Sequence, residues 1–222
     1  MLQGKTVVVT GASGALGSVV AATARTQGAS VVALDLIGGT ASADMRAFKV
    51  DLTDEAATNE CIGRIGGIDV VFNVAGGFDM GPAVHETSNE QWDHMFRMNV
   101  VTMRHVTASV VPQMIASGHG SIVNVGALSA LEGQGSMAAY CVAKSAVMRL
   151  TESLSKELRE QGININAVLP SIIDTPTNRR DMPTANFEKW VCPQDLANVI
   201  CFLGSDAAQA IHGALVPVRG LS

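Results

Sequence analysis

The chain has 222 residues, of which 47% are hydrophobic and 16% charged, and its formal net charge is −5. This length suits one α/β domain with a full core, and an acidic balance without a basic run argues against nucleic-acid binding. The four cysteines form no CxxC pair, the five histidines lack ligand spacing, and no apolar run is long enough for a membrane span.

These absences predict a cytoplasmic protein with free thiols, no metal site and no membrane segment. The chain starts almost directly with a strand, so we also expect no signal peptide.

In chain order, short β-branched runs alternate with segments of helical periodicity. Strands are predicted at 6–10, 30–34, 47–50, 68–72, 121–125, 163–169 and 214–218, and helices at 15–28, 54–64, 89–117, 136–160 and 193–204. Residues 176–190 are predicted to form a loop or lid. This alternation is typical of a Rossmann-type, doubly wound parallel β-sheet of about seven strands flanked by helices, in a single domain over residues 1–222.

A glycine-rich turn, TGASGALG at residues 10–17, joins the first predicted strand to the first helix. In that position the backbone can approach a pyrophosphate at the helix N-terminus. Asp35 ends the second strand, where its carboxylate can accept hydrogen bonds from an adenosine ribose diol. The same charge repels a 2′-phosphate and no arginine stands beside Asp35 in the sequence to compensate, so we expect NAD(H) to be favoured over NADP(H).

Tyr140 is the single tyrosine of the chain, and Lys144 lies four positions after it. Residues i and i+4 share a helix face, so both side chains can enter one pocket. A unit charge roughly 5 Å from the phenol stabilises its ionised form by roughly 3 kcal/mol, or about two pKa units. The pair is therefore a candidate for acid–base catalysis, although such pairs also occur as ordinary surface residues of helices.

Several motifs in this order resemble the short-chain dehydrogenase/reductase (SDR) pattern over essentially the whole chain. They are TGASGALG, Asp51-Leu52, Asn73-Val74-Ala75-Gly76, Asn99, the run GSIVNV at 120–125, Tyr140 with Lys144, and Pro170 with Ile173 and Thr175. The resemblance implies a Rossmann-type fold and NAD(P)-dependent oxidoreductase activity.

The resemblance also implies a role for each residue. Gly11, Ser13, Gly14, Leu16 and Gly17 would line the pyrophosphate; Asp51 and Leu52 would flank the adenine; Asn73, Ala75 and Gly76 would pack against the ribose and bridge; and Pro170, Ile173 and Thr175 would lie at the nicotinamide end. Lys144 would bind the nicotinamide ribose and lower the pKa of Tyr140. Asn99 would hold a water that relays protons to Lys144. The alternative for Asn99 is an amide that bends its helix through local hydrogen bonds.

Two positions depart from the family pattern. Ala15 replaces a glycine, and the neighbouring Gly14 is expected to compensate by supplying a flexible turn. Ala127 stands thirteen residues before Tyr140, where the family has its catalytic serine. Ser129 is the nearest hydroxyl, but a shift of about 6–7 Å along an extended chain argues against direct substitution.

Dihydropteridine reductases, a branch of the same superfamily, also lack that serine and resemble this chain in the segment 174–190, with the skeleton DTPxNRxxMPxAxFxxW. They use NADH to reduce quinonoid dihydropterin, where protonation can occur at nitrogen. We therefore expect an NAD(P)H-dependent reductase with Tyr140 as general acid, acting on a small conjugated carbonyl or imine. The alternatives are a non-catalytic NAD-binding sensor or partner protein, and an enzyme for dehydration or epimerisation.

Two further questions stay open at this level. Phe187 and Trp190 either contact substrate or pin the lid to the body of the protein. The helices at 89–117 and 136–160 are rich in apolar side chains (Met95, Met98, Met103, Val106, Met148 and Leu150). In the superfamily such helices pair across a two-fold axis, so we expect a dimer or tetramer, unless these side chains are covered within one protomer.

Overall fold

The computed structural model describes residues 1–37 and 45–222. Within these residues, seven parallel strands form one sheet in the order β3-β2-β1-β4-β5-β6-β7. The strands are β1 (Thr6–Thr10), β2 (Ser30–Asp35), β3 (Met45–Lys49), β4 (Val70–Asn73), β5 (Gly120–Val125), β6 (Ile163–Pro170) and β7 (Leu215–Val218). The predicted doubly wound parallel sheet is confirmed.

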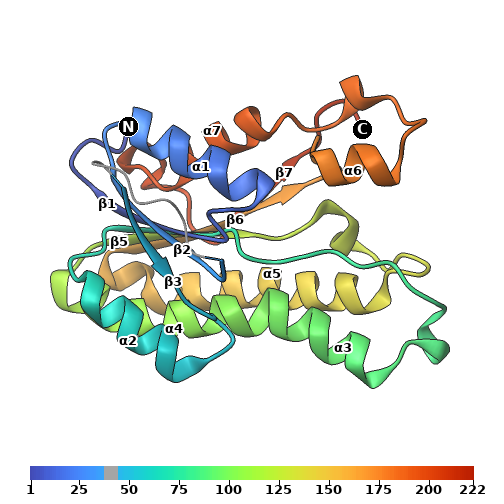
Figure 1. Cartoon of the computed structure of the whole chain (residues 1–222). Helices are drawn as coiled ribbons and strands as arrows, with labels where there is room; N and C mark the ends of the chain where they lie inside the picture. Colours follow the sequence, from blue (N-terminus) through green and yellow to red (C-terminus); the bar gives the residue numbers. More distant parts are fainter. Residues whose placement is uncertain (38–44) are drawn as a thin grey trace.

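Helices cover both faces of this sheet (Figure 1). They are α1 (Ala15–Thr26), α2 (Glu55–Ile65), α3 (Asn89–Phe96), α4 (Thr102–Ser117), α5 (Ala138–Leu158), α6 (Pro176–Asp181) and α7 (Pro193–Leu203). Helices α1 and α7 lie on one face, and α2, α4 and α5 on the other. Alternate side chains of β1 serve the two layers: Val7 and Val9 pack with the first, and Val8 with the second.

The strand order reverses beside β1, whose neighbours are β2 on one side and β4 on the other. The loops that leave β1 and β4 therefore diverge at their carboxyl ends, which is where ligands bind in open α/β sheets. Thr10 joins the two loops, because its Oγ1 accepts hydrogen bonds from the backbone N–H groups of Val74 and Ala75, both at 3.0 Å. The Thr10 side chain thus holds the loop after β4 against the end of β1.

Two segments differ from the sequence-based expectation. The helix predicted at 89–117 is interrupted by a π-helical turn, η2 (Arg97–Val101), where the amide of Asn99 donates to the carbonyl of Met95 at 3.0 Å. The predicted loop at 176–190 contains α6, because Thr175 accepts a hydrogen bond from the N–H of Asn178 and Pro176 suits the first helical turn. The hydrogen bond from the Asn99 side chain to the backbone accounts for the π-helical turn, and the cap by Thr175 accounts for α6.

The apolar side chains that suggested a subunit interface are mostly internal. Met95, Met103, Val106 and Met148 are buried within the protomer, and Met98 and Leu150 are half-buried. Their apolar character is thus largely explained by the protomer's own core.

Within residues 1–37 and 45–222, no helix combines the length and apolar character needed to cross a membrane. In the same described residues, no group of three or more His, Cys, Asp or Glu side chains is arranged to hold a metal ion.

Candidate active site

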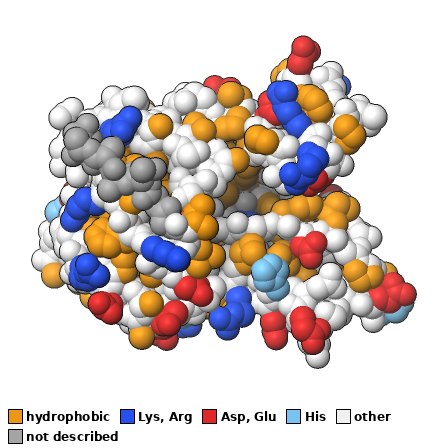
Figure 2. Space-filling view, viewed as in Figure 1, with side chains coloured by type: hydrophobic (Ala, Val, Ile, Leu, Met, Phe, Trp, Pro, Cys, Tyr) orange, Lys and Arg blue, Asp and Glu red, His pale blue; other side chains and the backbone are white. Residues whose placement is uncertain are grey.

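A cleft of 630 Å³ lies at the carboxyl ends of β1, β2 and β4, and Figure 2 shows a hollow on this face of the molecule. Of the residues proposed from sequence, it is lined by Gly11, Ser13, Gly14, Leu16, Gly17, Asp35, Asp51, Leu52, Ala75 and Gly76. Met98, the neighbour of Asn99, also lines it, as do Thr53, His94, Arg97 and Thr102, which no sequence motif had indicated. The cleft brings together residues from five separate segments of the chain.

The glycine turn has the backbone that a close ligand approach requires. Gly11 has φ +64°, and a Cβ there would lie 2.9 Å from the Cα of Ala75. A Cβ on Gly17 would collide with the carbonyl oxygen of Gly11. Gly14 has φ −75°, which any residue can adopt, so the expectation that it supplies a flexible turn is wrong. Ala15 is exposed at the first position of α1, and it lines the cleft.

The N-terminus of α1 has no side-chain cap and no acidic residue in its first turn. The first backbone N–H groups of α1 therefore have no side-chain acceptor. They and the helix dipole favour an anion at this end of the helix. Together with the glycine backbone, this arrangement fits the pyrophosphate of a nicotinamide dinucleotide.

Asp35 contacts the glycine turn directly. Its Oδ2 accepts a hydrogen bond from the N–H of Ser13 at 2.9 Å, and its Oδ1 accepts one from the N–H of Ile37 at 3.3 Å. Each carboxylate oxygen retains a further lone pair, so the group can still accept hydrogen bonds from a ribose diol. The contact with Ser13 places this negative charge beside the expected path of the pyrophosphate.

The segment Asp51–Thr53 is held by its own network. Asp51 Oδ1 accepts a hydrogen bond from the N–H of Thr53 at 2.8 Å. The carbonyl oxygen of Leu52 lies 3.0 Å from Nδ1 of the buried His105, whose Nε2 lies 2.9 Å from the guanidinium of Arg104. Since arginine only donates, Nε2 accepts and Nδ1 carries the hydrogen that it donates to Leu52. His105 is a support of this wall that sequence reasoning missed.

Asn73 lies below the cleft rather than in its wall. The residue is 4% exposed, and its Nδ2 donates to Oδ1 of Asn124 at 2.9 Å. Asn124 in turn donates to Oγ1 of Thr151 on α5, also at 2.9 Å. This buried chain joins β4, β5 and α5 through Nδ2 of Asn73, while Oδ1 of Asn73 is buried without a hydrogen-bond partner among the described residues. The packing of Asn73 against a ribose stays a prediction.

Lys144 and Asn99 lie beside Gly76, which lines the cleft. A Cβ on Gly76 would lie 2.7 Å from Oδ1 of Asn99 and 3.2 Å from Nζ of Lys144. The ammonium of Lys144 donates to the carbonyl oxygen of Val125 at 2.8 Å, and burial lowers the pKa of Lys144 to about 8. Gly76 lines the cleft, whereas Asn99 and Lys144 are buried directly behind it, and a side chain at position 76 would collide with both polar groups.

The side-chain amide of Asn99 is occupied by the protein itself. Its Oδ1 accepts from the N–H of Gly77 at 3.2 Å, and its Nδ2 donates to the carbonyls of Gly77 at 3.1 Å and Met95 at 3.0 Å. The local hydrogen bond that the alternative interpretation required is present, and a second pair of bonds fixes the loop after β4. The water relay through Asn99 stays a prediction.

Tyr140 lies at the start of α5, beside the loop that follows β4. Burial, and to a lesser extent the neighbouring Cys141, raises the pKa of Tyr140 above its usual value. For the protein by itself this direction is opposite to the lowering expected from Lys144, because the loss of hydration disfavours the phenolate. The effect of Lys144 with a cofactor bound stays a prediction. Phe78 packs edge-on against the phenol ring, with a centroid distance of 4.9 Å and an interplanar angle of 81°.

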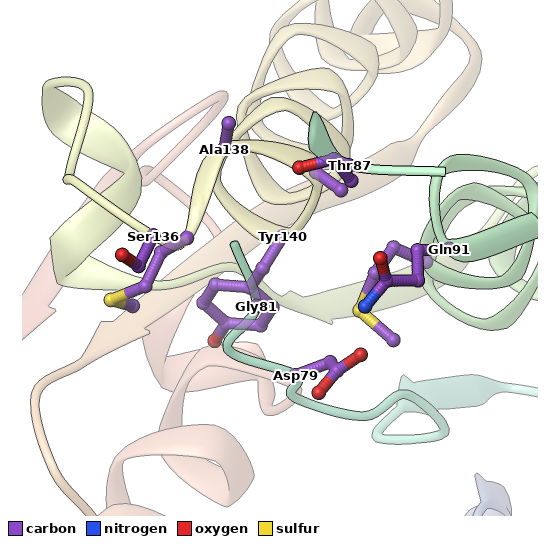
Figure 3. A pocket seen from close by; sticks show the side chains of 10 residues that line it. Asp79, Gly81, Thr87, Gln91, Ser136, Ala138 and Tyr140 are labelled. Carbon is purple, nitrogen blue, oxygen red and sulfur yellow. The ribbon is translucent and has the colours of Figure 1, made fainter. Parts of the chain in front are cut away.

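A second, much smaller cavity of 10 Å³ borders Tyr140. Figure 3 shows the phenol between the loop of Asp79 and Gly81 on one side and Ser136 on the other, with Gln91 nearby on α3. The N–H of Gly81 donates to the carbonyl of Ser136 at 2.8 Å, which ties the two loops together. A carboxylate, an amide and a hydroxyl thus surround the proposed catalytic tyrosine.

Ala127 occupies an apolar environment at the position of the family's serine. It is 3% exposed and packs in a cluster with Ala130, Met148 and Leu169, against which Tyr140 lies. Ser129 is half-buried in the short 3₁₀ turn that follows, and its carbonyl accepts a hydrogen bond from the thiol of Cys141. A buried methyl group therefore stands at the position where the family has a hydroxyl donor.

The lid is held by contacts among its own side chains. Arg179 forms a bidentate pair with Asp174, at 2.6 and 2.8 Å, and its guanidinium lies 4.7 Å from the ring centre of Phe187. Phe187 packs on the buried Trp190 at a centroid distance of 4.8 Å. These contacts support the interpretation that the two aromatic residues pin the lid.

The remaining predicted residues lie at the base of the lid. Ile173 bridges to Val191, and its carbonyl accepts from the amide of Asn178 at 2.8 Å. Thr175 caps α6, and Pro170 ends β6 opposite Val218. None of Pro170, Ile173 and Thr175 lines the described walls of the 630 Å³ cleft, so their contacts with a carboxamide stay predictions.

Comparison with known proteins decides the family, because the model of the short chain dehydrogenases matches residues 5–186. The chain belongs to the short-chain dehydrogenase family. The 3-oxoacyl-[acyl-carrier-protein] reductase FabG of Thermotoga maritima is 30% identical over 244 aligned positions, which cover 99% of this chain and 98% of that relative.

Solved structures of the family are similar over nearly the whole chain. A protein of Agrobacterium tumefaciens described as a 2-deoxy-D-gluconate 3-dehydrogenase, with bound NADP, has a TM-score of 0.89 at 28% identity, covering 99% of this chain and 96% of that one. A protein of Beutenbergia cavernae described as an NAD(P)-dependent gluconate 5-dehydrogenase has a TM-score of 0.88 at 27% identity, with the same coverage. This short-chain dehydrogenase is accordingly an NAD(P)-dependent oxidoreductase.

Proposed function

We propose that this short-chain dehydrogenase is a reductase, with Tyr140 as the general acid and NAD(H) as the preferred cofactor. We further propose that its substrate is a small conjugated carbonyl or imine, of which a quinonoid dihydropterin is the leading candidate. The single observation that carries this proposal is the buried methyl group of Ala127 beside Tyr140.

A second hydroxyl donor stabilises the negative charge that develops on oxygen when a simple ketone is reduced. Loss of such a preorganised donor commonly costs about 2.7–4 kcal/mol of transition-state stabilisation. A conjugated substrate spreads the incoming electron pair over its ring, and an imine is protonated at nitrogen, so neither depends as strongly on that donor. The replacement at position 127 therefore favours these substrates over simple ketones.

The state of Tyr140 suits the reductive direction. Since burial raises the pKa of Tyr140, the phenol holds its proton at neutral pH and can give it to the substrate atom that has gained electrons. A reduced nicotinamide bound in the cleft supplies the hydride. Lys144 would bind the ribose hydroxyls and stabilise the phenolate that remains after proton transfer. Its hydrogen bond to Val125 and its position beside Gly76 support this role.

The surroundings of the phenol offer an aromatic wall and a negative charge. Phe78 is 53% exposed while its edge contacts Tyr140, so one part of its ring is available to a planar substrate. The carboxylate of Asp79 lines the adjoining cavity and suits N–H donors or a partial positive charge on the substrate. Both features support a nitrogen-containing ring more than an anionic sugar acid.

The likeness of residues 174–190 to the lid of dihydropteridine reductases supports the pterin assignment. The preference for NAD(H) rests on Asp35, whose charge repels a 2′-phosphate, while the two structural neighbours above bind NADP. The water relay through Asn99 and the carboxamide contacts of Ile173 and Thr175 belong to the same proposal.

The test is NADH oxidation, followed at the nicotinamide absorbance, with quinonoid dihydropterin, simple quinones and simple ketones. We expect rapid turnover of the pterin and slow turnover of ketones, and we expect Tyr140→Phe to abolish turnover while NADH binding is nearly unchanged. Preferential turnover of simple ketones would refute the substrate class, and full activity of Tyr140→Phe would refute the acid. Tight NADH binding without any turnover would instead support a non-catalytic sensor, the function that Ala127 also permits.

We also propose that the protein assembles as a dimer or tetramer through α5 and the helical segment 89–117, which contains α3 and α4. Although most apolar residues of this region are internal, Val142 on α5 and Phe96 at the end of α3 remain 51% and 46% exposed. Light scattering coupled to size-exclusion chromatography tests this proposal. A wild-type monomer at micromolar concentration would contradict it.

A further inference from the structure

We propose that Arg97 binds the adenine ring and so determines the affinity for complete dinucleotides relative to a nicotinamide mononucleotide. This inference rests on dinucleotide binding in the 630 Å³ cleft. Arg97 belongs to no family motif of the sequence, and it is the one Arg or Lys among the described residues that line this cleft.

The guanidinium of Arg97 is held in place at one end of the cleft. Its Nη2 donates to Oγ1 of Thr53 at 3.1 Å, and Thr53 follows Leu52 in the wall that His105 supports. Within the described residues Arg97 forms no ion pair with a carboxylate. Because the side chain is exposed, one bond orients the group while its planar face and remaining N–H donors stay available to a ligand.

The π-helical turn explains how Arg97 and Asn99 serve the same site. In a regular α-helix two residues this close in sequence point to nearly opposite sides. Here the extra residue of η2 lets Arg97 and Met98 line the cleft while Asn99 reaches Gly76 and Gly77, which lie at its other end. Such insertions are frequent at functional sites.

The direction of the cleft identifies the part of the ligand that meets Arg97. The glycine turn and the N-terminus of α1 mark the pyrophosphate, and Gly76 with Lys144 marks the nicotinamide side. Leu52 and Thr53 belong to neither group and line the same cleft, so the adenosine is expected to extend towards them. A planar guanidinium stacks on a purine and can donate to its ring nitrogens.

The alternative ligand for this cation is a 2′-phosphate. The ribose hydroxyls are expected at Asp35, whose carboxylate is bound to the N–H groups of Ser13 and Ile37. Arg97 is instead bonded to Thr53, next to the segment expected to flank the base. The adenine assignment predicts equal losses for NADH and NADPH when Arg97 is replaced, whereas a phosphate contact predicts a loss for NADPH alone.

The experiment measures dissociation constants of NADH, NADPH and reduced nicotinamide mononucleotide by nicotinamide fluorescence. We expect Arg97→Met to weaken NADH and NADPH alike by roughly 3- to 30-fold, as for a lost cation–π contact. Binding of the mononucleotide should change less than about twofold, because it lacks the adenine. Arg97→Lys keeps the positive charge but removes the planar guanidinium group, so we expect most of the same loss of affinity for NADH and NADPH.

Arg149→Met is the matched control, since Arg149 lies on α5 outside the described walls of the cleft and pairs with Glu152. It removes one positive charge and should leave all three constants unchanged. An equal loss for the mononucleotide, unchanged NADH binding in Arg97→Met, or a loss confined to NADPH would overturn the adenine assignment. Failure of the wild-type protein to bind any dinucleotide would refute the proposed cofactor site itself.

Discussion

Replacing Lys144 by methionine removes an ammonium whose burial lowers the pKa of that residue from 10.5 to about 8. Because the folded-state pKa lies below the unfolded one, the unfolded chain binds more protons between these values, and wild-type stability rises with pH across this window. A shift of about 2.5 units corresponds to about 3 kcal/mol of destabilisation at neutral pH. Methionine fills a similar volume and carries no charge, so the variant lacks this pH-dependent penalty.

One opposing effect is independent of pH. Lys144 donates to the carbonyl of Val125, and leaving that buried group unpaired costs about 1–3 kcal/mol. The diagnostic quantity is therefore the difference in unfolding free energy between wild type and Lys144→Met as a function of pH. We expect wild type to gain about 2.5 kcal/mol relative to the variant between pH 7 and pH 10.

The assay is urea denaturation at a series of pH values, followed by circular dichroism. Lys156→Met is the control, since Lys156 lies on the same helix but is exposed. Its difference from wild type should show no comparable trend with pH. A constant difference between wild type and Lys144→Met across the range would refute the reasoning, because it would mean that burial does not lower the pKa of Lys144.

Three further predictions concern activity and binding. Ala127→Ser restores a donor beside Tyr140 and should raise kcat/KM for simple ketones about tenfold or more; an unchanged value would show that this donor is not limiting. Asp35→Asn keeps an acceptor for the N–H of Ser13 but removes the negative charge, so NADH should bind about tenfold more weakly and NADPH relatively better. Fluorescence titration measures both dissociation constants, and an unchanged ratio between them would contradict the prediction. Arg179→Gln breaks the pair with Asp174 and should raise KM more than it lowers kcat, with faster hydrogen exchange in residues 176–190; a protected lid with normal KM would show that the pair is dispensable.

The sequence predicted features that depend on local periodicity and on short motifs. The seven strands could be placed because β-branched runs are buried on both faces of a parallel sheet. The glycine turn could be placed because Gly11 and Gly17 meet steric demands that only glycine satisfies. Even so, the capped helix α6 was missed within the predicted lid, and the π-helical turn was missed within a pattern that read as one helix.

Contacts between distant segments were beyond the reach of such patterns. Asn73 belongs to a motif associated with the cofactor, yet it bonds to Asn124 deep in the sheet. His105 had no motif at all, and its role follows from the packing of α4 near Leu52. The burial that raises the pKa of Tyr140 in the protein by itself was also hidden from the sequence, because spacing reveals a nearby charge but not the loss of hydration.

The sequence by itself thus determined the order of strands and helices, the place of the glycine turn, and Tyr140, Lys144 and Ala127 as candidate site positions, since local periodicity and short motifs encode these features. The tertiary structure alone decided which polar groups face the cleft, which are used by the protein itself, and that Arg97 joins Thr53 at one end of the cleft. The physical reason is that hydration and hydrogen-bond partners depend on segments brought together by folding, which no local pattern records.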